Sequence, residues 1–309
     1  MRPPSPRLRW ASVPKVTIVE VGPRDGLQNE RAAITTADKI AFVDRLSAAG
    51  HQVIEVSAFV SPKWVPQMAD AADVFAGITR RPGTRYTALV PNQQGLARAI
   101  AAGVSEVGIF AAASETFSRR NINQSIDESL ATYAAVCADA KGAGLPVRGY
   151  LSTCFVCPFE GPVDPQRVAD IAARLLAMGV FEVAISDTIG AATPGDVLRV
   201  LETVSVRLAL HQTALHFHDT RGTALANVLA GLDYGVATFD SSAGGLGGCP
   251  FAPGAAGNLA TEDLLFMLNG LGIETGVSID AVAEASRLIE PKLDHSLPSR
   301  YLQAPKVIS

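Results

Sequence analysis

The chain has 309 residues, of which 48% are hydrophobic and 18% are charged, so it can bury a large core and shows no sign of global disorder. Its formal net charge of −4 and the lack of a long basic run argue against non-specific binding to nucleic acid, which depends on lysine and arginine meeting phosphates. No window offers about 18 uninterrupted apolar residues, so a membrane-spanning helix is not expected.

Short β-branched or apolar runs recur along the chain and alternate with alanine-rich stretches of helical character. The runs predict strands at residues 15–21, 53–56, 85–89, 106–110, 146–151, 182–186, 213–217 and 237–241. The stretches between them predict helices at residues 36–49, 93–102, 126–143, 165–178, 194–206 and 223–234, with two more at 261–271 and 279–288. Glycine follows many of these helices, as expected for a left-handed helix stop, at Gly50, Gly103, Gly144, Gly179 and Gly235.

Eight strand–helix units of this rhythm indicate an α/β protein with a (β/α)₈ TIM barrel more strongly than an open doubly wound sheet. No G-x-G-x-x-G motif follows the first strand, which removes the main support for a dinucleotide-binding sheet. We therefore expect residues 1–309 to form a single domain. The barrel would span about 15–242, followed by a glycine-rich loop and C-terminal helices at 243–309.

The cysteines and the chain ends carry little functional signal. Four cysteines do not make a disulfide framework, and we expect Cys154-x-x-Cys157 to be structural or to line a site. The basic start lacks the apolar region of a secretory signal, and three prolines oppose the helix of a transit peptide. We expect a cytoplasmic bacterial protein and consider the mitochondrial matrix less favoured.

The main chemical signal is the motif His216-x-His218 at the end of the predicted seventh strand. Side chains alternate along a strand, so both imidazoles point to one face, where they can form half of a metal site. Barrel enzymes gather their chemistry where strands end, and Asp25 follows the first strand while Asn258 follows the eighth. These two oxygen donors and two imidazoles suit Mg²⁺ or Mn²⁺, although Cys249 keeps Zn²⁺ in play.

Several long strings in the chain resemble those of the 3-hydroxy-3-methylglutaryl-CoA lyase family. The matching strings are VEVGPRDGLQNE at 19–30, SPKWVPQM at 61–68, NIN at 121–123, SDTIG at 186–190 and GGLGGCPFAPGAAGNLATED at 244–263. The resemblance runs from about residue 16 to at least residue 263. It implies a dimeric, metal-dependent TIM-barrel lyase that cleaves (S)-3-hydroxy-3-methylglutaryl-CoA to acetyl-CoA and acetoacetate.

The resemblance also implies roles for individual residues. The metal ligands would be Asp25, His216, His218 and Asn258. Arg24 would be the cationic catalytic residue and also contact the substrate, and Cys249 would be the thiol of a mobile loop. Further groups implied at the site are Glu55 and Asp187 as catalytic residues and Gln28 and Asn121 as substrate-binding residues. The last residues lack the C-terminal cysteine and peroxisomal tripeptide of animal members, so we expect neither thiol-linked dimer regulation nor peroxisomal targeting.

The chemistry explains why such residues would be needed. Cleavage between C2 and C3 of a 3-hydroxyacyl thioester removes the hydroxyl proton and releases an enolate, which Arg24 can stabilise because it stays charged. Cys249 can protonate the enolate or act as a base, Asp187 is a second candidate for moving the hydroxyl proton, and the sequence does not rank the two. The glycines before Cys249 suggest a lid, and Glu55 could equally be a structural partner of Arg24.

Two other functions fit parts of the pattern. A related metal-dependent lyase or Claisen-type synthase could act on another 3-hydroxyacyl-CoA with the same central residues. A catalytically silent CoA-binding barrel would be expected to lack one or more of those residues, and all are present. The expected partners are an acyl-CoA substrate and a second copy of the chain in a homodimer, with no nucleic acid and no membrane.

Overall fold

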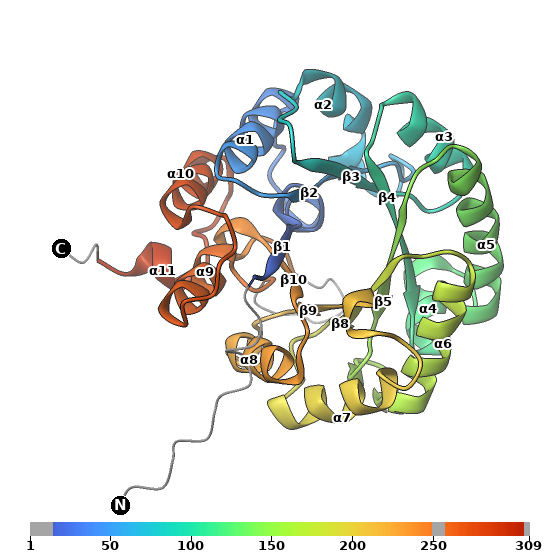
Figure 1. Cartoon of the computed structure of the whole chain (residues 1–309). Coiled ribbons are helices and arrows are strands. Elements are labelled where there is room, and N and C mark those ends of the chain that lie inside the picture. The colour runs from blue at the N-terminus through green and yellow to red at the C-terminus, as the bar shows by residue number, and fades with distance from the viewer. Residues whose placement is uncertain (1–14, 249–256, 306–309) are drawn as a thin grey trace, which may run out of the picture.

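The computed structural model describes residues 15–248 and 257–305. Within these ranges, eight parallel strands close into a barrel, and helices surround it (Figure 1). The barrel strands are β1 (Thr17–Glu20), β2 (Val53–Ala58), β3 (Arg85–Leu89), β4 (Glu106–Ala112), β5 (Val147–Ser152), β8 (Glu182–Asp187), β9 (Thr213–Phe217) and β10 (Thr238–Ser241). Each strand pairs with its neighbours in chain order, and β10 pairs with β1. The predicted (β/α)₈ TIM barrel is confirmed.

The outer layer consists mainly of the predicted helices. They are α1 (Thr36–Ala48), α3 (Gln93–Ala101), α5 (Ile126–Gly142), α6 (Pro165–Ala177), α7 (Pro194–Val204) and α8 (Ala224–Tyr234), followed by α9 (Thr261–Gly270) and α10 (Ile279–Ile289). The glycines predicted to stop helices at positions 50, 103, 144, 179 and 235 all have positive φ. The helix α10 packs against α1 and α9, which places the C-terminal helices beside the start of the barrel (Figure 1).

Some short elements were not predicted from the sequence. They are the helices α2 (Ala71–Gly77), α4 (Glu115–Ile122) and α11 (Arg300–Gln303), the two-stranded hairpin β6 (Val156–Cys157) and β7 (Gly161–Pro162), the π-helical turn η2 (Gly22–Gly26), and the single 3₁₀ turns η3 (Pro66–Met68), η4 (Leu210–Gln212), η5 (Ala243–Gly245) and η6 (Glu290–Lys292). Each is too short to show a clear apolar period, so tertiary contacts and end caps decide them.

The cysteine motif has a structural setting in the loop after β5. Cys154 and Cys157 are both buried and free, and the Cys154 thiol donates to the Leu151 carbonyl oxygen at 2.9 Å. The Cys157 sulfur lies 2.9 Å from the Ser114 hydroxyl oxygen. Burial raises the pKa of the Cys154 thiol, which keeps it protonated and unreactive. The prediction of a structural role agrees with these contacts.

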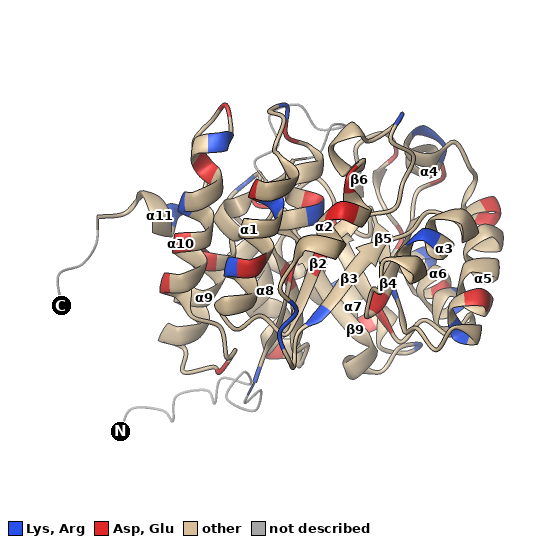
Figure 2. Ribbon diagram, turned by 90° about the horizontal axis from the view of Figure 1, so that it is seen from above, with Lys and Arg blue, Asp and Glu red and all other residues tan. Residues whose placement is uncertain are grey.

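The surface of the barrel carries both signs of charge. Figure 2 shows lysine and arginine interspersed with aspartate and glutamate over the described helices, without a block of one sign on this face. No described helix is long and apolar enough to cross a membrane. One exposed aromatic side chain stands out, because Trp64 is 86% exposed in the loop after β2.

Candidate active site

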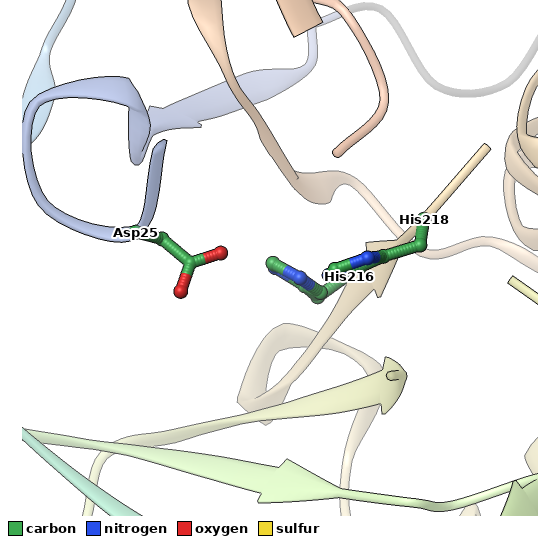
Figure 3. A group of neighbouring side chains, drawn as sticks. All are labelled: Asp25, His216 and His218. Atoms are coloured by element: carbon green, nitrogen blue, oxygen red, sulfur yellow. The ribbon is translucent and has the colours of Figure 1, made fainter. Parts of the chain in front are cut away.

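Three side chains predicted as metal ligands meet at one end of the barrel. Potential ligand atoms of Asp25, His216 and His218 all lie within 4.8 Å of one another. Figure 3 shows the Asp25 carboxylate on the turn that follows β1, directed toward the imidazole of His216 on β9. The histidines are buried, and the Asp25 side chain is 18% exposed. The carboxylate is therefore the most accessible member of the group.

The turn η2 explains how two consecutive residues reach the site. The backbone N–H groups of Arg24, Asp25 and Gly26 all donate to the Val21 carbonyl oxygen, at 3.2, 2.8 and 3.2 Å. This tight winding directly follows β1, at the carboxyl end of the barrel strands where (β/α)₈ proteins place their chemistry. Short π-helical turns are frequent at functional sites, and this one carries both Arg24 and Asp25.

The predicted fourth ligand, Asn258, lies beside this group. The segment after the undescribed part of the loop pairs with the end of β9, where His218 and Asn258 form an antiparallel bridge. The Asn258 amide nitrogen donates to Asp25 Oδ2 at 2.8 Å and to the Leu246 carbonyl oxygen at 3.1 Å. Its amide oxygen is buried without a hydrogen-bond partner. A buried acceptor left in this state fits a bound cation.

Two of the three ligand groups, Asp25 and His218, are in the protonation states that bind metals. Burial works against the charge on Asp25, but the positive Arg24 and the nearby histidines outweigh it and lower the pKa of Asp25 to about 2. Burial lowers the pKa of His218 to about 4, so its imidazole is neutral at physiological pH. An ionised carboxylate and a neutral imidazole are the forms in which these groups ligate metals.

Arg24 is held between two carboxylates beside the metal-ligand group. Its Nη1 lies 2.6 Å from Asp25 Oδ1, and its Nε and Nη2 lie 2.8 and 2.7 Å from Glu55 Oε2. The guanidinium also lies over the Tyr150 ring, 5.5 Å from its centroid. Burial disfavours its charge, but Glu55 and Asp25 more than compensate and raise the pKa of Arg24. A permanently charged, fixed guanidinium therefore faces the site. The predicted structural partnership of Glu55 with Arg24 is present.

The other predicted site residues have different settings. Both carboxylate oxygens of Asp187 accept backbone N–H groups, from Ala191 at 3.0 Å and Ala192 at 2.9 Å, so this residue fixes the loop after β8. Gln28 is half-buried just after η2, and Asn121 is exposed near the end of α4. No hydrogen bond connects either of these two side chains to the described ligand group. Cys249 lies outside the described residues.

The glycine-rich loop approaches the ligand group closely. A Cβ atom at Gly247 would lie 2.5 Å from the Asn258 amide nitrogen, and one at Gly257 would collide with the carbonyl oxygen of Gly245. The Asn29 side chain donates to the Gly248 carbonyl oxygen at 2.9 Å and so connects the loop to η2. These glycines allow backbone to pass where any side chain would clash, which the sequence indicated only as flexibility.

Two buried acids near the site were not recognised from the sequence. Asp240 on β10 lies with its Oδ2 atom 3.2 Å from His216 Nδ1. Glu20, at the end of β1, accepts the N–H groups of Gly22 at 2.8 Å and Ala243 at 2.9 Å, and thereby joins η2 to the start of the glycine-rich loop. Both are charged residues within predicted strands, and that position was the available signal.

A second group of potential ligands lies near the C-terminus. It contains Glu30, Asp294 and His295, but the two His295 ring nitrogens already contact Glu30 Oε2 at 2.8 Å and the Ser296 carbonyl oxygen at 3.0 Å. The hydrogen bond to the Ser296 carbonyl and the nearby Glu30 raise the pKa of His295. The group is an ion pair that attaches the C-terminal segment to the barrel. His295 therefore has a structural role at the surface of the barrel.

Comparison with known proteins places these residues in a family. A family model described as HMGL-like matches residues 15–289. The 3-hydroxy-3-isohexenylglutaryl-CoA/hydroxy-methylglutaryl-CoA lyase of Pseudomonas aeruginosa is 54% identical over 290 residues, which is 94% of this chain and 97% of the relative. The hydroxymethylglutaryl-CoA lyase of Bacillus subtilis is 51% identical over 289 residues, again 94% of this chain and 97% of the relative.

The solved structures agree with the sequence comparison. A crystal structure of hydroxymethylglutaryl-CoA lyase from Pseudomonas aeruginosa superimposes with a TM-score of 0.92 at 53% identity and covers 94% of this chain and 97% of its own. The similarity therefore extends over the whole barrel and includes the segments that carry Asp25, His216, His218 and Asn258. From the family model and these relatives, we conclude that the chain belongs to the HMGL-like family.

Proposed function

We propose that the chain is a divalent-metal-dependent carbon–carbon lyase that cleaves 3-hydroxy-3-methylglutaryl-CoA to acetyl-CoA and acetoacetate. One observation carries the proposal: a metal-ligand group of Asp25, His216 and His218, with Asn258 beside it, adjoins the fixed cation Arg24. The relatives at 51–54% identity are lyases by name.

The donor set fits Mg²⁺ or Mn²⁺. One carboxylate, two imidazoles and the unpartnered amide oxygen of Asn258 would hold the ion and leave positions for substrate oxygens. When bound, such an ion supplies Lewis acidity that lowers the pKa of the substrate hydroxyl and fixes its orientation. We favour Mg²⁺ or Mn²⁺ over Zn²⁺ because the set mixes carboxylate, amide and imidazole donors.

Arg24 would stabilise the negative charge of the departing acetyl-CoA enolate. When the C2–C3 bond breaks, its electrons move to the thioester fragment, and the C3 hydroxyl becomes the ketone of acetoacetate. A guanidinium clamped by Glu55 and Asp25 cannot turn away or lose its proton, so its charge is already in place as the enolate forms. Glu55 is a positioning residue in this proposal, because it acts through Arg24.

A proton must leave the C3 hydroxyl and one must reach C2. The residues before Cys249 lie at the site, since Gly247 adjoins Asn258 and Gly248 is bonded to Asn29. We assign both transfers to Cys249, whose thiolate would take the hydroxyl proton and, as the thiol, would then give that proton to C2 of the enolate. Asp187 already accepts two backbone N–H groups and is assigned the role of holding its loop. Gln28 and Asn121 are proposed to contact the substrate on the strength of the family resemblance.

A second substrate is favoured by one relative. The Pseudomonas aeruginosa protein is named for 3-hydroxy-3-isohexenylglutaryl-CoA as well as for the methyl compound. Both substrates would use the same cleavage chemistry and differ only in the group on C3. The alternative function is therefore a lyase for a longer acyl-CoA in the same barrel.

Turnover of the two thioesters tests the proposal. The purified protein, treated with a chelator and reloaded with Mg²⁺ or Mn²⁺, is assayed for acetyl-CoA release from each. We expect activity to vanish on chelation and return with metal, with the methyl compound giving the higher kcat/KM. A higher kcat/KM for the isohexenyl compound would assign the alternative, and activity that persists after chelation would overturn the metal-dependent mechanism.

The proposal also covers the oligomeric state, the domain organisation and the location of the protein. We propose a homodimer, a single catalytic unit formed by the barrel and its C-terminal helices, and a cytoplasmic location. The packing of α10 against α1 supports the single unit. Sedimentation of the purified protein would test the dimer.

A further inference from the structure

The two ligand histidines differ in what lies behind them. His216 Nδ1 is 3.2 Å from Asp240 Oδ2, and the parallel register of β9 and β10 places these two residues opposite each other. The Nδ1 atom of His218 is buried with no hydrogen-bond partner. One imidazole is therefore oriented by a carboxylate, and the other is not.

Asp240 is itself held from the opposite side. Arg148 on β5 donates to both of its carboxylate oxygens, from Nη2 to Oδ1 at 2.8 Å and from Nη1 to Oδ2 at 3.2 Å. Arg148 also donates from Nε to Glu182 Oε1 at 2.7 Å, and its guanidinium lies 4.9 Å from the centroid of the Tyr150 ring. The Asp240 and Arg148 side chains are almost fully buried. Arg148 and Glu182 therefore hold the Asp240 carboxylate in a fixed position next to the His216 ring.

This arrangement dictates which ring nitrogen of His216 carries the proton. A carboxylate that accepts from both ends of a guanidinium fork has the geometry of an ionised group, and an ionised carboxylate has no hydrogen to donate. The Nδ1 atom of His216 must then donate to Asp240. In the neutral imidazole, the remaining nitrogen, Nε2, then carries the lone pair that a metal ion would use.

We propose that Asp240 is a positioning residue that fixes the Nδ1–H tautomer and the ring orientation of His216, and that Arg148 and Glu182 hold Asp240 in place for this purpose. The inference rests on the proposed metal site. A purely structural reading treats Asp240 as the counter-ion of Arg148 alone. The two readings differ in whether the state of the His216 ring depends on Asp240.

The substitution Asp240→Asn separates these readings because it has a directional consequence. Oδ1 makes the shorter contact with Arg148, at 2.8 Å, so the amide oxygen of the new side chain is expected at that position. The NH₂ group then takes the position of Oδ2, which faces His216 and the more distant Nη1 of Arg148. The imidazole must then accept at Nδ1 and carry its proton on Nε2, the nitrogen that the metal needs. Glu106→Gln is the matched control. Glu106 is also a buried carboxylate of the barrel interior, but it pairs with Arg85 and makes no hydrogen bond to His216.

Two measurements on the purified proteins test the proposal. The first is the tautomer of His216 from ¹⁵N–¹H correlation spectra of metal-free protein labelled at histidine. The second is Mn²⁺ affinity by titration calorimetry. We expect an Nδ1–H tautomer in the wild type and in Glu106→Gln. In Asp240→Asn we expect an Nε2–H tautomer and Mn²⁺ binding weaker by roughly 10- to 100-fold.

The outcomes separate this proposal from the proposed function. An Nε2–H tautomer in the wild-type protein would overturn the inference even if no variant folded. Wild-type Mn²⁺ affinity in folded Asp240→Asn, or an equal loss in Glu106→Gln, would overturn it as well. Neither measurement uses a substrate, so failure of both thioesters to turn over would remove the proposed function and leave these results standing.

Discussion

Both ends of the barrel interior contain charged residues, but the two ends differ in whether the buried polar atoms have hydrogen-bond or ion-pair partners. At the amino ends of the strands, a cavity of about 140 Å³ is lined in part by Arg85, Glu106, Arg148 and Glu182. These residues neutralise one another, since Arg85 lies 2.8 Å from Glu106 and Arg148 lies 2.7 Å from Glu182. None of the four has a buried polar atom without a partner.

At the carboxyl ends of the strands, buried polar atoms remain unpaired. They include Glu55 Oε1, His218 Nδ1 and Asn258 Oδ1. Leaving a buried acceptor unsatisfied costs about 1–3 kcal/mol, so a fold selected only for stability would not collect several of them in one place. Bound metal and substrate can supply the missing partners. We call the amino ends of the strands the paired end and the carboxyl ends the unpaired end. The paired end holds the unpaired end rigid.

The comparison predicts first that a residue of the unpaired end matters for activity and little for stability. Asp25→Ala should lower kcat/KM by about three orders of magnitude, because it removes a ligand of an ion that contributes several kcal/mol to the transition state. Its melting temperature should stay close to that of the wild type, since Arg24 keeps Glu55 as its partner. Kinetics with saturating Mn²⁺ and thermal melts give both values.

The exposed carboxylate Asp73 on α2 provides the control for this measurement. Asp73→Ala removes the same charge from the surface and should leave kcat/KM unchanged. If Asp25→Ala retained activity within a few-fold of the wild type, Asp25 would not be a metal ligand, and the proposed role of this end of the barrel would be wrong.

The reverse pattern is expected at the paired end. Arg148→Met leaves the buried carboxylates of Asp240 and Glu182 without their cation, and breaking a buried pair in this way costs about 3–5 kcal/mol. Urea unfolding at pH 7 measures the loss. Arg174→Met is the control, because the Arg174–Asp127 pair is exposed and should contribute less than about 1 kcal/mol. Equal losses in the two variants would contradict the importance assigned to the buried pair.

The sequence was sufficient to predict the unpaired end and insufficient for the paired end. His216, His218 and Asp25 could be brought together because they stand at the ends of predicted strands, and the barrel places all strand ends on one rim. Asp240 lies inside a predicted strand. Its relation to His216 depends on the register of two strands and on the direction of both side chains, which a single sequence does not specify.

Local conformation set a second limit. The sequence placed Asp25 just after the first predicted strand, but it did not indicate that three N–H groups converge on one carbonyl oxygen there. The short helix α2 lies after a proline-containing loop and has no side-chain cap, so nothing in its sequence marked it as a helix. In the loop after β2, Phe59 is buried whereas Trp64 is exposed, and both are aromatic residues that the sequence alone does not distinguish.

Glu20 lies at the unpaired end but contributes to stability, and this contribution should depend on pH. Burial raises its pKa to about 8, against hydrogen bonds and a usual value of 4.5. The folded protein then binds a proton that the unfolded chain has lost, so this group's stabilisation is complete below about pH 4.5 and disappears as the pH rises toward 8. The steepest loss is about 1.4 kcal/mol per pH unit for one proton.

Glu20→Gln removes this titration and keeps an amide oxygen for the N–H groups of Gly22 and Ala243. The difference in unfolding free energy between the variant and the wild type should therefore shift in favour of the variant from pH 5 to pH 8. Burial lowers the pKa of the neighbouring His51 to about 3, so its imidazole stays neutral in the folded protein over this pH range. Its titration in the unfolded chain is common to both proteins. A difference that stays constant over this range would mean that Glu20 is ionised throughout.

The smallest loss of unfolding free energy is expected on substitution of Arg85, the partly exposed member of the paired end. Its side chain is 48% exposed, and its partner Glu106 is buried. Burial raises the pKa of Glu106 to about 7, although Arg85 and Arg148 act in the opposite direction. In Arg85→Met, Glu106 can take up a proton near neutral pH instead of remaining as an unpaired charge, so the loss should be about 1 kcal/mol or less.

Urea unfolding at pH 6 and pH 8 should show the larger loss at pH 8, because proton uptake then becomes unfavourable. A loss as large as that of Arg148→Met at both pH values would show that partial exposure does not protect this end, and the comparison would then rest on Arg148 and Asp240 alone.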